Sequence, residues 1–442
     1  MNERDSEAIA CMLEAHGFLP AETEQDADIL IFNTCSVRDQ AERKAEGKIG
    51  LLRKRKRERP DLVIGVVGCM AQNHGAALTS RLEHVDFVLG TDRLDRLPEA
   101  VSDALGARER TVDTGVEARR HNVVGGHHAG QHSAYVAVMR GCNQFCTYCI
   151  VPYVRGREKS RSIAEVVDEV ETLTRNGTVE IFLLGQNITA YGFAEARREK
   201  SDVSGISPFA DLLEAVHEVP GVRRIRFTSP HPKYMNERFM EAVTTLPKVC
   251  NAFHIPLQSG SDRILDRMRR GYNVQSYLAC IEAIRNRAPD AVFSTDVIVG
   301  FPGETANDFE ATRSVMAEVG FDMAYIFKYS PRSGTRASEW EDDVPKDIKE
   351  SRNRIVLADL EDYVEKANQR YRGRDVEVLV EGVSKRNADR WAGKTRSGKH
   401  CFFTPVAGLT PGQFVQVRVD RATSHSLYGA VVGRDLKKAD GF

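Results

Sequence analysis

The chain has 442 residues, and its 62 Lys or Arg and 63 Asp or Glu give a net charge of −1. At about 150 residues per domain, this length predicts roughly three domains, each able to bury a core. The 41% apolar and 28% charged residues are typical of globular proteins, which excludes global disorder and fibrous classes. No stretch approaches about 18 consecutive apolar residues, and the charged first residues differ from a signal peptide. We therefore expect a cytoplasmic protein.

The first hundred residues alternate amphipathic stretches with short apolar ones. Apolar residues 27–34, 62–68 and 84–91 are typical of strands separated by helices, which predicts a parallel α/β domain over residues 1–105. Cys35 directly follows the first of these strands, and Cys69 follows the second. Both thiols are therefore expected at the carboxyl edge of the sheet, where open α/β sheets bind their ligands.

Residues 106–132 lack periodicity and are rich in Gly, His and Arg, which predicts a linker. A longer α/β alternation over residues 133–370 predicts a partial (βα)6 barrel with its active site at the strand C-termini. Short strands with Gly-rich turns over residues 371–436 predict a small β-barrel. The fold class is therefore α/β with a C-terminal β-barrel. The six strands expected in the central domain are 134–141, 179–185, 223–229, 252–258, 291–301 and 323–330.

Three of the nine cysteines form a compact group. Cys142, Cys146 and Cys149 have C-x3-C-x2-C spacing and follow the first strand of the central domain. Soft thiolates favour iron–sulfur clusters or zinc, and structural zinc usually has four protein ligands. Three cysteines on one loop suit a [4Fe–4S] cluster with one iron open to a further ligand, with zinc as the alternative.

This loop resembles that of the radical S-adenosylmethionine (radical SAM) superfamily, and the longer string CNQFCTYCIVPYVRGRE is similar to that of the methylthiotransferases. The likeness covers nearly the whole chain, and the C-terminal barrel resembles a TRAM domain. Further strings that agree are FNTCSVR (32–38), GCMAQ (68–72), LLGQN (183–187), HIPLQSGSDRIL (254–265), STDVIVGFPGET (294–305) and YSPRSGT (329–335).

The resemblance implies that a [4Fe–4S] cluster on the three-cysteine loop binds and cleaves S-adenosylmethionine. The string is most similar to the branch that acts on N6-isopentenyladenosine at position 37 of tRNA, next to the anticodon. That branch adds sulfur and a methyl group at C2 and forms 2-methylthio-N6-isopentenyladenosine. The implied partners are tRNA, an electron donor of flavodoxin or ferredoxin type, and a sulfur source.

Two other functions stay open. The same chemistry could act on threonylcarbamoyl-adenosine in tRNA or on an aspartate of a ribosomal protein. A function of another class is that of a zinc-containing RNA-binding protein without catalytic activity.

The resemblance also implies an auxiliary [4Fe–4S] cluster that is held by three cysteines of the first domain. Cys35 and Cys69 match two of these ligands; as an alternative, both are buried structural thiols. The third lies in a motif such as GCQMN, and this sequence begins just after the position of that cysteine. We expect either a further segment upstream of Met1 or a cluster with two cysteine ligands. Cys11 lies among Ile9, Met12 and Leu13, which predicts a core position.

Weaker candidates for cofactor contacts lie in the cysteine loop and at strand ends. Tyr148 belongs to the loop itself. Gln186 and Asn187 follow one strand and are expected near the amino-acid end of S-adenosylmethionine, whereas Gln258 and Ser259 follow another and are expected near its ribose. Ordinary polar strand ends are an equally good interpretation of these four residues.

Several basic residues are candidates for RNA contacts. Arg155 and Arg157 follow the cysteine loop, and the basic run 53–59 is either an RNA contact or a solvated helix face. The histidines 127, 128 and 132 lack regular spacing, so we expect them to be solvated. In the C-terminal domain, basic residues interleaved with aromatic ones indicate phosphate contacts and base stacking. These are Lys385, Arg386, Arg390, Lys394 and Arg396, beside Trp391, Phe402 and Phe403.

Overall fold

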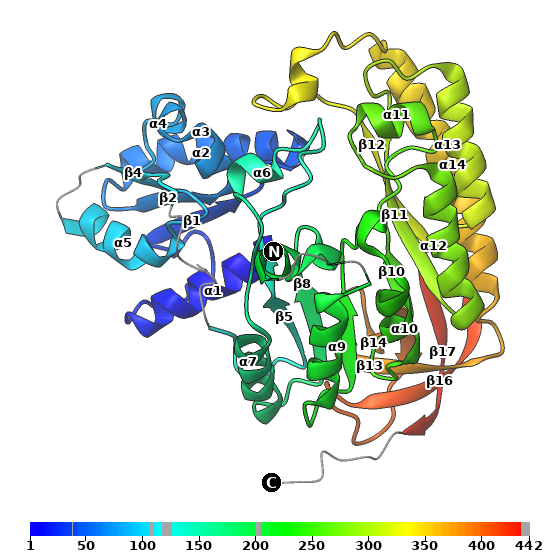
Figure 1. Ribbon diagram of the computed structural model, residues 1–442. Coiled ribbons are helices and arrows are strands. Elements are labelled where there is room, and N and C mark those ends of the chain that lie inside the picture. The colour runs from blue at the N-terminus through cyan, green and yellow to red at the C-terminus, as the bar shows by residue number, and fades with distance from the viewer. Residues whose placement is uncertain (38, 107–109, 117–125, 200–202, 204, 435–442) are drawn as a thin grey trace. The chain divides into compact units, whose positions relative to one another are not determined.

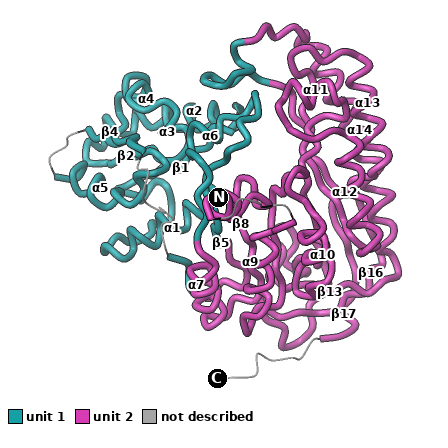
Figure 2. The backbone as a smooth tube through the Cα atoms, in the orientation of Figure 1, with its two compact units in different colours: residues 1–129, 137–161, 330–339 teal, residues 130–136, 162–329, 340–442 magenta. Residues whose placement is uncertain are grey.

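A computed structural model describes residues 1–37, 39–106, 110–116, 126–199, 203 and 205–434 (Figure 1). Parts of the predicted linker, 107–109 and 117–125, lie outside the described residues, as do residues 435–436 of the predicted C-terminal domain. The chain forms two compact units (Figure 2). Unit 1 comprises residues 1–129, 137–161 and 330–339, and unit 2 comprises residues 130–136, 162–329 and 340–442. The predicted domain boundaries stay predictions.

Unit 1 contains the predicted parallel sheet, with strand order β1-β2-β3-β4. The sequence pattern missed β4, because a strand of three residues is too short to show a period. The elements of this unit are α1 (Asn2–Ala15), β1 (Ile29–Thr34), α2 (Asp39–Glu58), β2 (Val63–Gly68), α3 (Cys69–His74), α4 (Ala76–Arg81), β3 (Phe87–Leu89), η1 (Leu94–Arg96), α5 (Leu97–Gly106), β4 (Thr111–Asp113), β6 (Met139–Arg140), α6 (Val151–Val154), β7 (Lys159–Ser160) and η4 (Arg336–Glu339).

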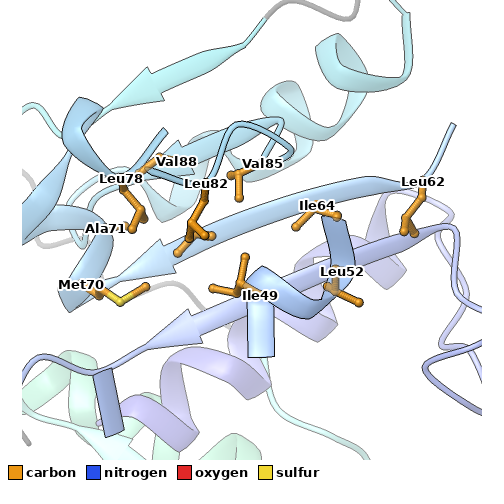
Figure 3. Close-up of a cluster of buried hydrophobic side chains, with 11 residues drawn as sticks. Ile49, Leu52, Leu62, Ile64, Met70, Ala71, Leu78, Leu82, Val85 and Val88 are labelled. Carbon is orange, nitrogen blue, oxygen red and sulfur yellow. The ribbon is translucent and has the colours of Figure 1, made fainter. Parts of the chain in front are cut away.

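The sheet of unit 1 has a hydrophobic core on each face, because side chains alternate along a buried strand. In β2, Ile64 and Val66 face the core formed with α2, α3 and α4 (Figure 3), whereas Val63 and Val67 face the core formed with α1 and α5. Position 65, between Ile64 and Val66, requires glycine, because a Cβ atom there would lie 2.0 Å from the Phe87 ring. This packing fixes the strand ends that carry Cys35 and Cys69.

All six predicted strands of the central domain are present, in two three-stranded sheets ordered β5-β8-β9 and β10-β11-β12 that lie almost wholly in unit 2. The first predicted strand, 134–141, is split into β5 and the short β6 of unit 1. A parallel bridge between Ile225 and Val249 continues β9 toward the second sheet. The elements are β5 (Ser133–Ala137), whose last residue belongs to unit 1, α7 (Ile163–Arg175), β8 (Glu180–Leu184), η2 (Ile188–Ala190), α8 (Phe193–Glu199), α9 (Pro208–Glu218), β9 (Arg224–Phe227), η3 (Pro232–Tyr234), α10 (Glu237–Thr245), β10 (Ala252–His254), α11 (Asp262–Arg267), α12 (Val274–Arg287), β11 (Val292–Val299), α13 (Ala306–Val319), β12 (Met323–Lys328) and α14 (Lys346–Gln369).

The predicted small β-barrel is also present in unit 2, closed in the order β13-β14-β15-β17-β16. Its core contains Val378, Val380, Cys401, Phe403 and Val417, all almost fully buried. No helix among the described residues is long and apolar enough to cross a membrane. The barrel strands are β13 (Asp375–Ser384), β14 (Asn387–Thr395), β15 (His400–Thr404), β16 (Phe414–Ala422) and β17 (Ser426–Arg434).

Candidate functional site

Cys35 and Cys69 leave the sheet of unit 1 at the same edge. Strands β1 and β2 are parallel, and their last residues, Thr34 and Gly68, are partners in the register. Gly68 has φ of 90°, and a Cβ atom there would lie 2.6 Å from Oδ1 of Asn33, so the turn before Cys69 requires glycine. The parallel register therefore brings the two predicted ligands to neighbouring strand ends.

Arg155 contacts Cys69 directly. Its Nε donates to Sγ of Cys69 at 3.3 Å, and its Nη2 donates to Oδ2 of Asp5 at 2.7 Å. Its Nη1 is buried and has no hydrogen-bond partner among the described residues. Burial raises the pKa of the Cys69 thiol, and the Arg155 charge opposes part of that rise. The buried cation and its unpaired N–H group fit a bound anionic group beside this thiol.

The predicted RNA contact of Arg155 is therefore wrong, because the side chain is buried and held by Asp5 and Cys69. The sequence could not reveal this, since Cys69 lies 86 positions earlier in the chain.

A second arginine that the sequence reasoning missed lies near Cys35. Arg332 of the YSPRSGT string donates to the carbonyl oxygen of Val37 at 3.2 Å, and the Val37 N–H lies 3.4 Å from Sγ of Cys35.

Cys11 lies away from this pair of thiols. The first turn of α1 lies beside β1, where Nδ2 of Asn33 donates to the Asn2 carbonyl oxygen at 2.9 Å. Cys11 is nine residues further along the helix, which is roughly 13 Å at 1.5 Å per residue. The expectation that Cys11 belongs to the core is also wrong, because its side chain is only half-buried while Ile9, Met12 and Leu13 pack on the core.

The loop with Cys142, Cys146 and Cys149 is a compact turn between β6 and α6. The N–H of Cys142 donates to the Gly156 carbonyl at 3.1 Å, and that of Cys149 donates to the Cys146 carbonyl at 3.0 Å. Phe145 has a left-handed backbone with φ of 48°, and the guanidinium of Arg157 lies 4.2 Å from its ring centroid. A non-glycine residue in that conformation is strained unless its surroundings hold it, so the ring contact stabilises the turn.

Among the three loop cysteines, Cys142 and Cys146 are buried and Cys149 is half-buried. Three soft thiol donors on one short loop are the donor set of an iron–sulfur cluster. Tyr148 lies between them and is half-buried. Arg157 is exposed, so its predicted contact with RNA or substrate stays a prediction.

The two cysteine groups are neighbours within unit 1. Cys69 packs in one buried cluster with Ile150, which follows Cys149, and with Val154 of α6. The hydroxyl of Thr91 donates to the Val154 carbonyl at 2.6 Å and ties α6 to the sheet. One stretch of chain, 142–155, therefore carries three thiols and then the arginine that contacts Cys69.

Two strand-end residues in unit 2 have polar atoms without partners. Both amide atoms of Gln186 and the Nδ2 of Asn187 are buried without a hydrogen-bond partner among the described residues. Buried amides are normally paired, so these atoms fit a polar ligand at the end of β8. The predicted contact of this pair with the amino-acid end of S-adenosylmethionine gains support, but it stays a prediction.

The other predicted strand-end pair is already engaged within the fold. The Oγ of Ser259 accepts from the Ser261 N–H at 3.2 Å and lies 3.4 Å from Oγ1 of Thr312. Ser259 is fully buried, so its hydroxyl is not available to a ribose, and that expectation is wrong. Gln258 has φ of 70°, and its backbone N–H donates to the Asp296 carbonyl at 2.8 Å; the role of its side chain stays a prediction.

The structure adds polar residues near these strand ends that the sequence reasoning missed. His231 follows β9 and is buried, and its Nε2 has no hydrogen-bond partner among the described residues. Burial, with Arg270 and Lys233 nearby, lowers the pKa of His231 well below its usual value, so the ring is neutral at pH 7. Nε2 of His254 in β10 lies 3.3 Å from Oδ2 of Asp296 in β11. The consecutive polar residues Ser294, Thr295 and Asp296 in the otherwise apolar β11 were the available signal.

In the barrel, Lys385 and Arg386 are exposed near the β13–β14 turn. Lys394 is paired with Glu381 at 3.2 Å. Nη2 of Arg396 donates to the carbonyl oxygens of Pro247 and Val249 at 2.7 Å each and so joins the barrel to the central sheet within unit 2; its predicted RNA contact stays a prediction.

A surface of the barrel that we call the Tyr428 face combines stacked rings and guanidinium groups. Tyr428 stacks on Phe402 with a centroid distance of 5.5 Å. The guanidinium of Arg390 lies 5.4 Å from the Tyr428 centroid, and that of Arg421 lies 3.9 Å from it. Arg421 and Tyr428 were not among the predicted residues, because strand register alone brings them to Arg390 and Phe402. Trp391 and Phe403, in contrast, pack in the barrel core.

Two other sequence expectations concern basic residues and histidines of unit 1. In the basic run, Arg55 donates to the Glu24 carbonyl and Lys56 is paired with Asp86, so these two residues support the fold. Nδ1 of His127 lies 3.5 Å from Oε1 of Glu7, and Nδ1 of His128 lies 3.9 Å from Sγ of Cys11. The expectation that these histidines are solvated is therefore wrong for His127, which is half-buried beside Glu7, whereas His128 is exposed as expected.

Comparison with known proteins gives matches along nearly the whole chain. The family model of the radical SAM superfamily matches residues 136–316, that of the uncharacterized protein family UPF0004 matches residues 1–90, and that of the TRAM domain matches residues 369–432. The tRNA-2-methylthio-N(6)-dimethylallyladenosine synthase of Opitutus terrae is 44% identical, over 99% of this chain and 97% of its own. That of Akkermansia muciniphila is 43% identical, over 97% and 96%.

A solved structure with a similar fold is the radical S-adenosylmethionine methyltransferase TsrM from Kitasatospora setae, which contains cobalamin and a [4Fe–4S] cluster. Its TM-score is 0.53 at 14% sequence identity, over 76% of this chain and 66% of that one. At this identity the likeness concerns the fold alone.

Proposed function

The chain belongs to the radical SAM enzymes that methylthiolate tRNA, and we propose on this basis that it modifies N6-isopentenyladenosine at position 37, next to the anticodon. The proposed product is 2-methylthio-N6-isopentenyladenosine. S-adenosylmethionine and [4Fe–4S] clusters are the cofactors of this family. The observation that carries the proposal is the packing of Cys69 against Ile150 and Val154, which joins two separate cysteine groups in one unit.

The loop cysteines Cys142, Cys146 and Cys149 would hold the first cluster. Bound there, a [4Fe–4S] cluster supplies the electron that cleaves S-adenosylmethionine and so makes an unactivated C–H bond reactive. The compact loop keeps two of the three thiols buried and shields them from water and oxidants. The unpaired amides of Gln186 and Asn187 would orient the amino and carboxylate groups of S-adenosylmethionine.

Cys35 and Cys69 would hold the auxiliary cluster that provides sulfur. Arg155 places a buried positive charge at Cys69, which favours the thiolate that a metal requires. Arg332 anchors the segment after Cys35 by its bond to the Val37 carbonyl. These contacts position the two ligands but leave the identity of a third ligand open.

The Tyr428 face would contact the tRNA. Base stacking on Phe402 and Tyr428 together with phosphate contacts from Arg390 and Arg421 suits a single-stranded RNA loop. We further propose a flavodoxin- or ferredoxin-type electron donor, a separate sulfur source for the auxiliary cluster, and a place in the cytoplasm, where tRNA is modified.

The proposed substrate is tested by offering three candidate substrates to the anaerobically reconstituted protein. S-adenosylmethionine and a reductant are present in each reaction. These are tRNA with N6-isopentenyladenosine, tRNA with threonylcarbamoyl-adenosine, and the ribosomal protein whose aspartate is the third alternative. Mass spectrometry should find a methylthio group in place of hydrogen in the first substrate only. A methylthio group on either of the other two would assign the chain to that branch, and a colourless protein that binds only zinc would contradict the enzymatic function.

A further inference from the structure

A group of metal-ligating side chains lies on α1, away from the cysteine pair at the sheet edge. Sγ of Cys11, a carboxylate oxygen of Glu14 and a ring nitrogen of His128 all lie within 4.8 Å of one another. Sγ of Cys11 lies 3.9 Å from Nδ1 of His128. All three residues belong to unit 1, and they come from two segments more than 100 positions apart.

The segment that carries His128 is fixed on α1 by contacts other than those of the three ligands. The N–H of His128 donates to Oε1 of Glu7 at 3.0 Å, and Nδ1 of His127 lies 3.5 Å from the same oxygen. Gly126 has φ of 101°, and a Cβ atom there would lie 2.6 Å from Cβ of Cys11. Glu7, Cys11 and Glu14 are spaced i, i+4 and i+7, so they share one face of the helix. The close approach of the Gly126 backbone to Cys11 therefore requires glycine. The contacts with Glu7 hold residues 127 and 128 on the same face of the helix.

We propose that Cys11, Glu14 and His128 form a site for a divalent ion of the zinc type. Thiolate, imidazole and carboxylate are the three ligand classes of zinc sites, and three protein ligands leave a fourth position for water. The thiolate and the Glu14 carboxylate together balance a charge of +2. Binding displaces the thiol proton to solvent and needs no oxidant or reductant.

The geometry requires only a small adjustment. Ligand atoms of tetrahedral zinc lie about 3.5 Å apart, as follows from Zn–S of about 2.3 Å and Zn–N of about 2.0 Å. Glu14 and His128 have exposed side chains, so a change of rotamer can close the remaining distance without disturbing the core. The ion would clamp residues 126–128 to α1. This site is independent of the proposed function, because no ligand of it belongs to either cysteine group.

The test uses the full chain with its iron–sulfur clusters reconstituted, so that the cluster cysteines are occupied before zinc is added. After equilibration with zinc chloride and desalting, zinc and iron are counted by mass spectrometry. We expect about one zinc ion per chain, and its loss in Cys11→Ser and in His128→Ala with unchanged iron. Matched controls are His16→Ala at the C-cap of α1 and Cys280→Ser on α12, which should keep the zinc.

Zinc X-ray absorption separates this site from zinc bound at the cluster cysteines. The expected spectrum has one sulfur at about 2.3 Å and the remaining ligands nitrogen or oxygen at about 2.0 Å. If Cys11→Ser does not fold, Glu14→Gln, on an exposed side chain, serves in its place. Zinc retained in these variants, a first shell dominated by sulfur, or no zinc in the unmodified chain would each overturn the proposal.

Discussion

Arg155 connects the two cysteine groups at the scale of single residues. It lies six positions after Cys149 in the sequence, and its Nε is 3.3 Å from Sγ of Cys69. Asp5 accepts from the other side of the guanidinium at 2.7 Å, so the arginine is held between a carboxylate and a thiol. A change at Arg155 should therefore affect the chemistry of Cys69 before it affects RNA binding.

The cysteines are expected to divide the reaction into two parts. Cys142→Ala, Cys146→Ala or Cys149→Ala should abolish cleavage of S-adenosylmethionine, because each removes a ligand of the loop cluster. Cys35→Ala or Cys69→Ala should leave cleavage intact, lose about four iron atoms per chain, and block thiolation. The measurements are 5'-deoxyadenosine formation, iron content and nucleoside mass. Thiolation that persists in any of the five variants would refute the role given to that cysteine.

Arg155→Met should weaken the auxiliary cluster and leave the loop cluster in place. The substitution removes a charge-assisted hydrogen bond, worth about 1.5–3 kcal/mol, and leaves Asp5 without this partner. We expect lower iron content, an altered electron paramagnetic resonance signal from the second cluster, and slower thiolation with unchanged cleavage of S-adenosylmethionine. Arg155→Lys should restore part of the iron.

Arg81→Met is the matched control, because Arg81 of α4 lies in the same unit and pairs with Glu46 instead of a cysteine. The role of Arg155 would be disproved by a full complement of iron and normal thiolation in Arg155→Met. A loss of iron in Arg81→Met equal to that in Arg155→Met would also contradict it.

At the scale of elements, the strands could be predicted from the sequence but several side-chain roles could not. Apolar runs located β1, β2 and all six central strands, because buried parallel strands have continuous apolar sequences. Cysteine spacing located the loop group, whereas Cys35 and Cys69 were located by their positions after two strands. The roles of Arg155, Arg396 and Tyr428 depend on contacts between distant segments, which neither spacing nor periodicity encodes.

Buried ion pairs join the barrel to the central sheet within unit 2. Arg224 is fully buried and donates to Oε1 of Glu377 in β13 at 2.7 Å, and Nε of Arg226 donates to Oε2 of Glu180 in β8 at 2.8 Å. Nη2 of Arg226 also donates to the Thr395 carbonyl at 2.6 Å. Removing one partner would leave a buried charge uncompensated, which is far more costly than breaking a surface pair.

Glu180→Gln should lower the free energy of unfolding by about 3 kcal/mol at pH 7. Burial alone would raise the pKa of Glu180, but Arg226 and Arg224 outweigh it and hold the pKa below 4.5. A depressed pKa stabilises the fold above pH 4.5, and this contribution is lost as the pH falls through the folded-state pKa. The difference between wild type and Glu180→Gln in urea unfolding should therefore shrink in acid.

Glu171→Gln is the control for this prediction, because Glu171 forms an exposed pair with Arg175 in α7. It should change the free energy of unfolding by no more than about 0.5 kcal/mol. Equal effects of the two substitutions, or a Glu180→Gln effect that grows in acid, would contradict the importance of the buried pair.

Arg421→Ala on the Tyr428 face should weaken tRNA binding about threefold to tenfold. Loss of one phosphate contact should also reduce the slope of log affinity against log salt by about 1. Arg418→Ala is the control on the same strand, because Arg418 is engaged with Asp375. Filter binding at several salt concentrations measures both quantities. Unchanged affinity and slope in Arg421→Ala would remove the Tyr428 face from the RNA interface.

At the scale of the whole molecule, the chain combines three parts that the proposed reaction needs. Unit 1 contains both cysteine groups, and unit 2 contains the strand-end amides and the barrel with the Tyr428 face. A simple RNA-binding protein would not need two groups of cysteines, one of them beside a buried arginine. A radical SAM enzyme that uses an auxiliary cluster as its sulfur source needs both.

The most direct test of this account is the mass of position 37 in isopentenylated tRNA after one anaerobic turnover with the reconstituted protein, beside its Cys69→Ala variant. The account predicts a methylthio group in place of hydrogen at C2 with the unmodified chain. It predicts 5'-deoxyadenosine without thiolation in the variant. An unmodified adenosine together with normal S-adenosylmethionine cleavage by the unmodified chain would contradict the proposed substrate, and equal thiolation by both proteins would contradict the role of the auxiliary cysteines.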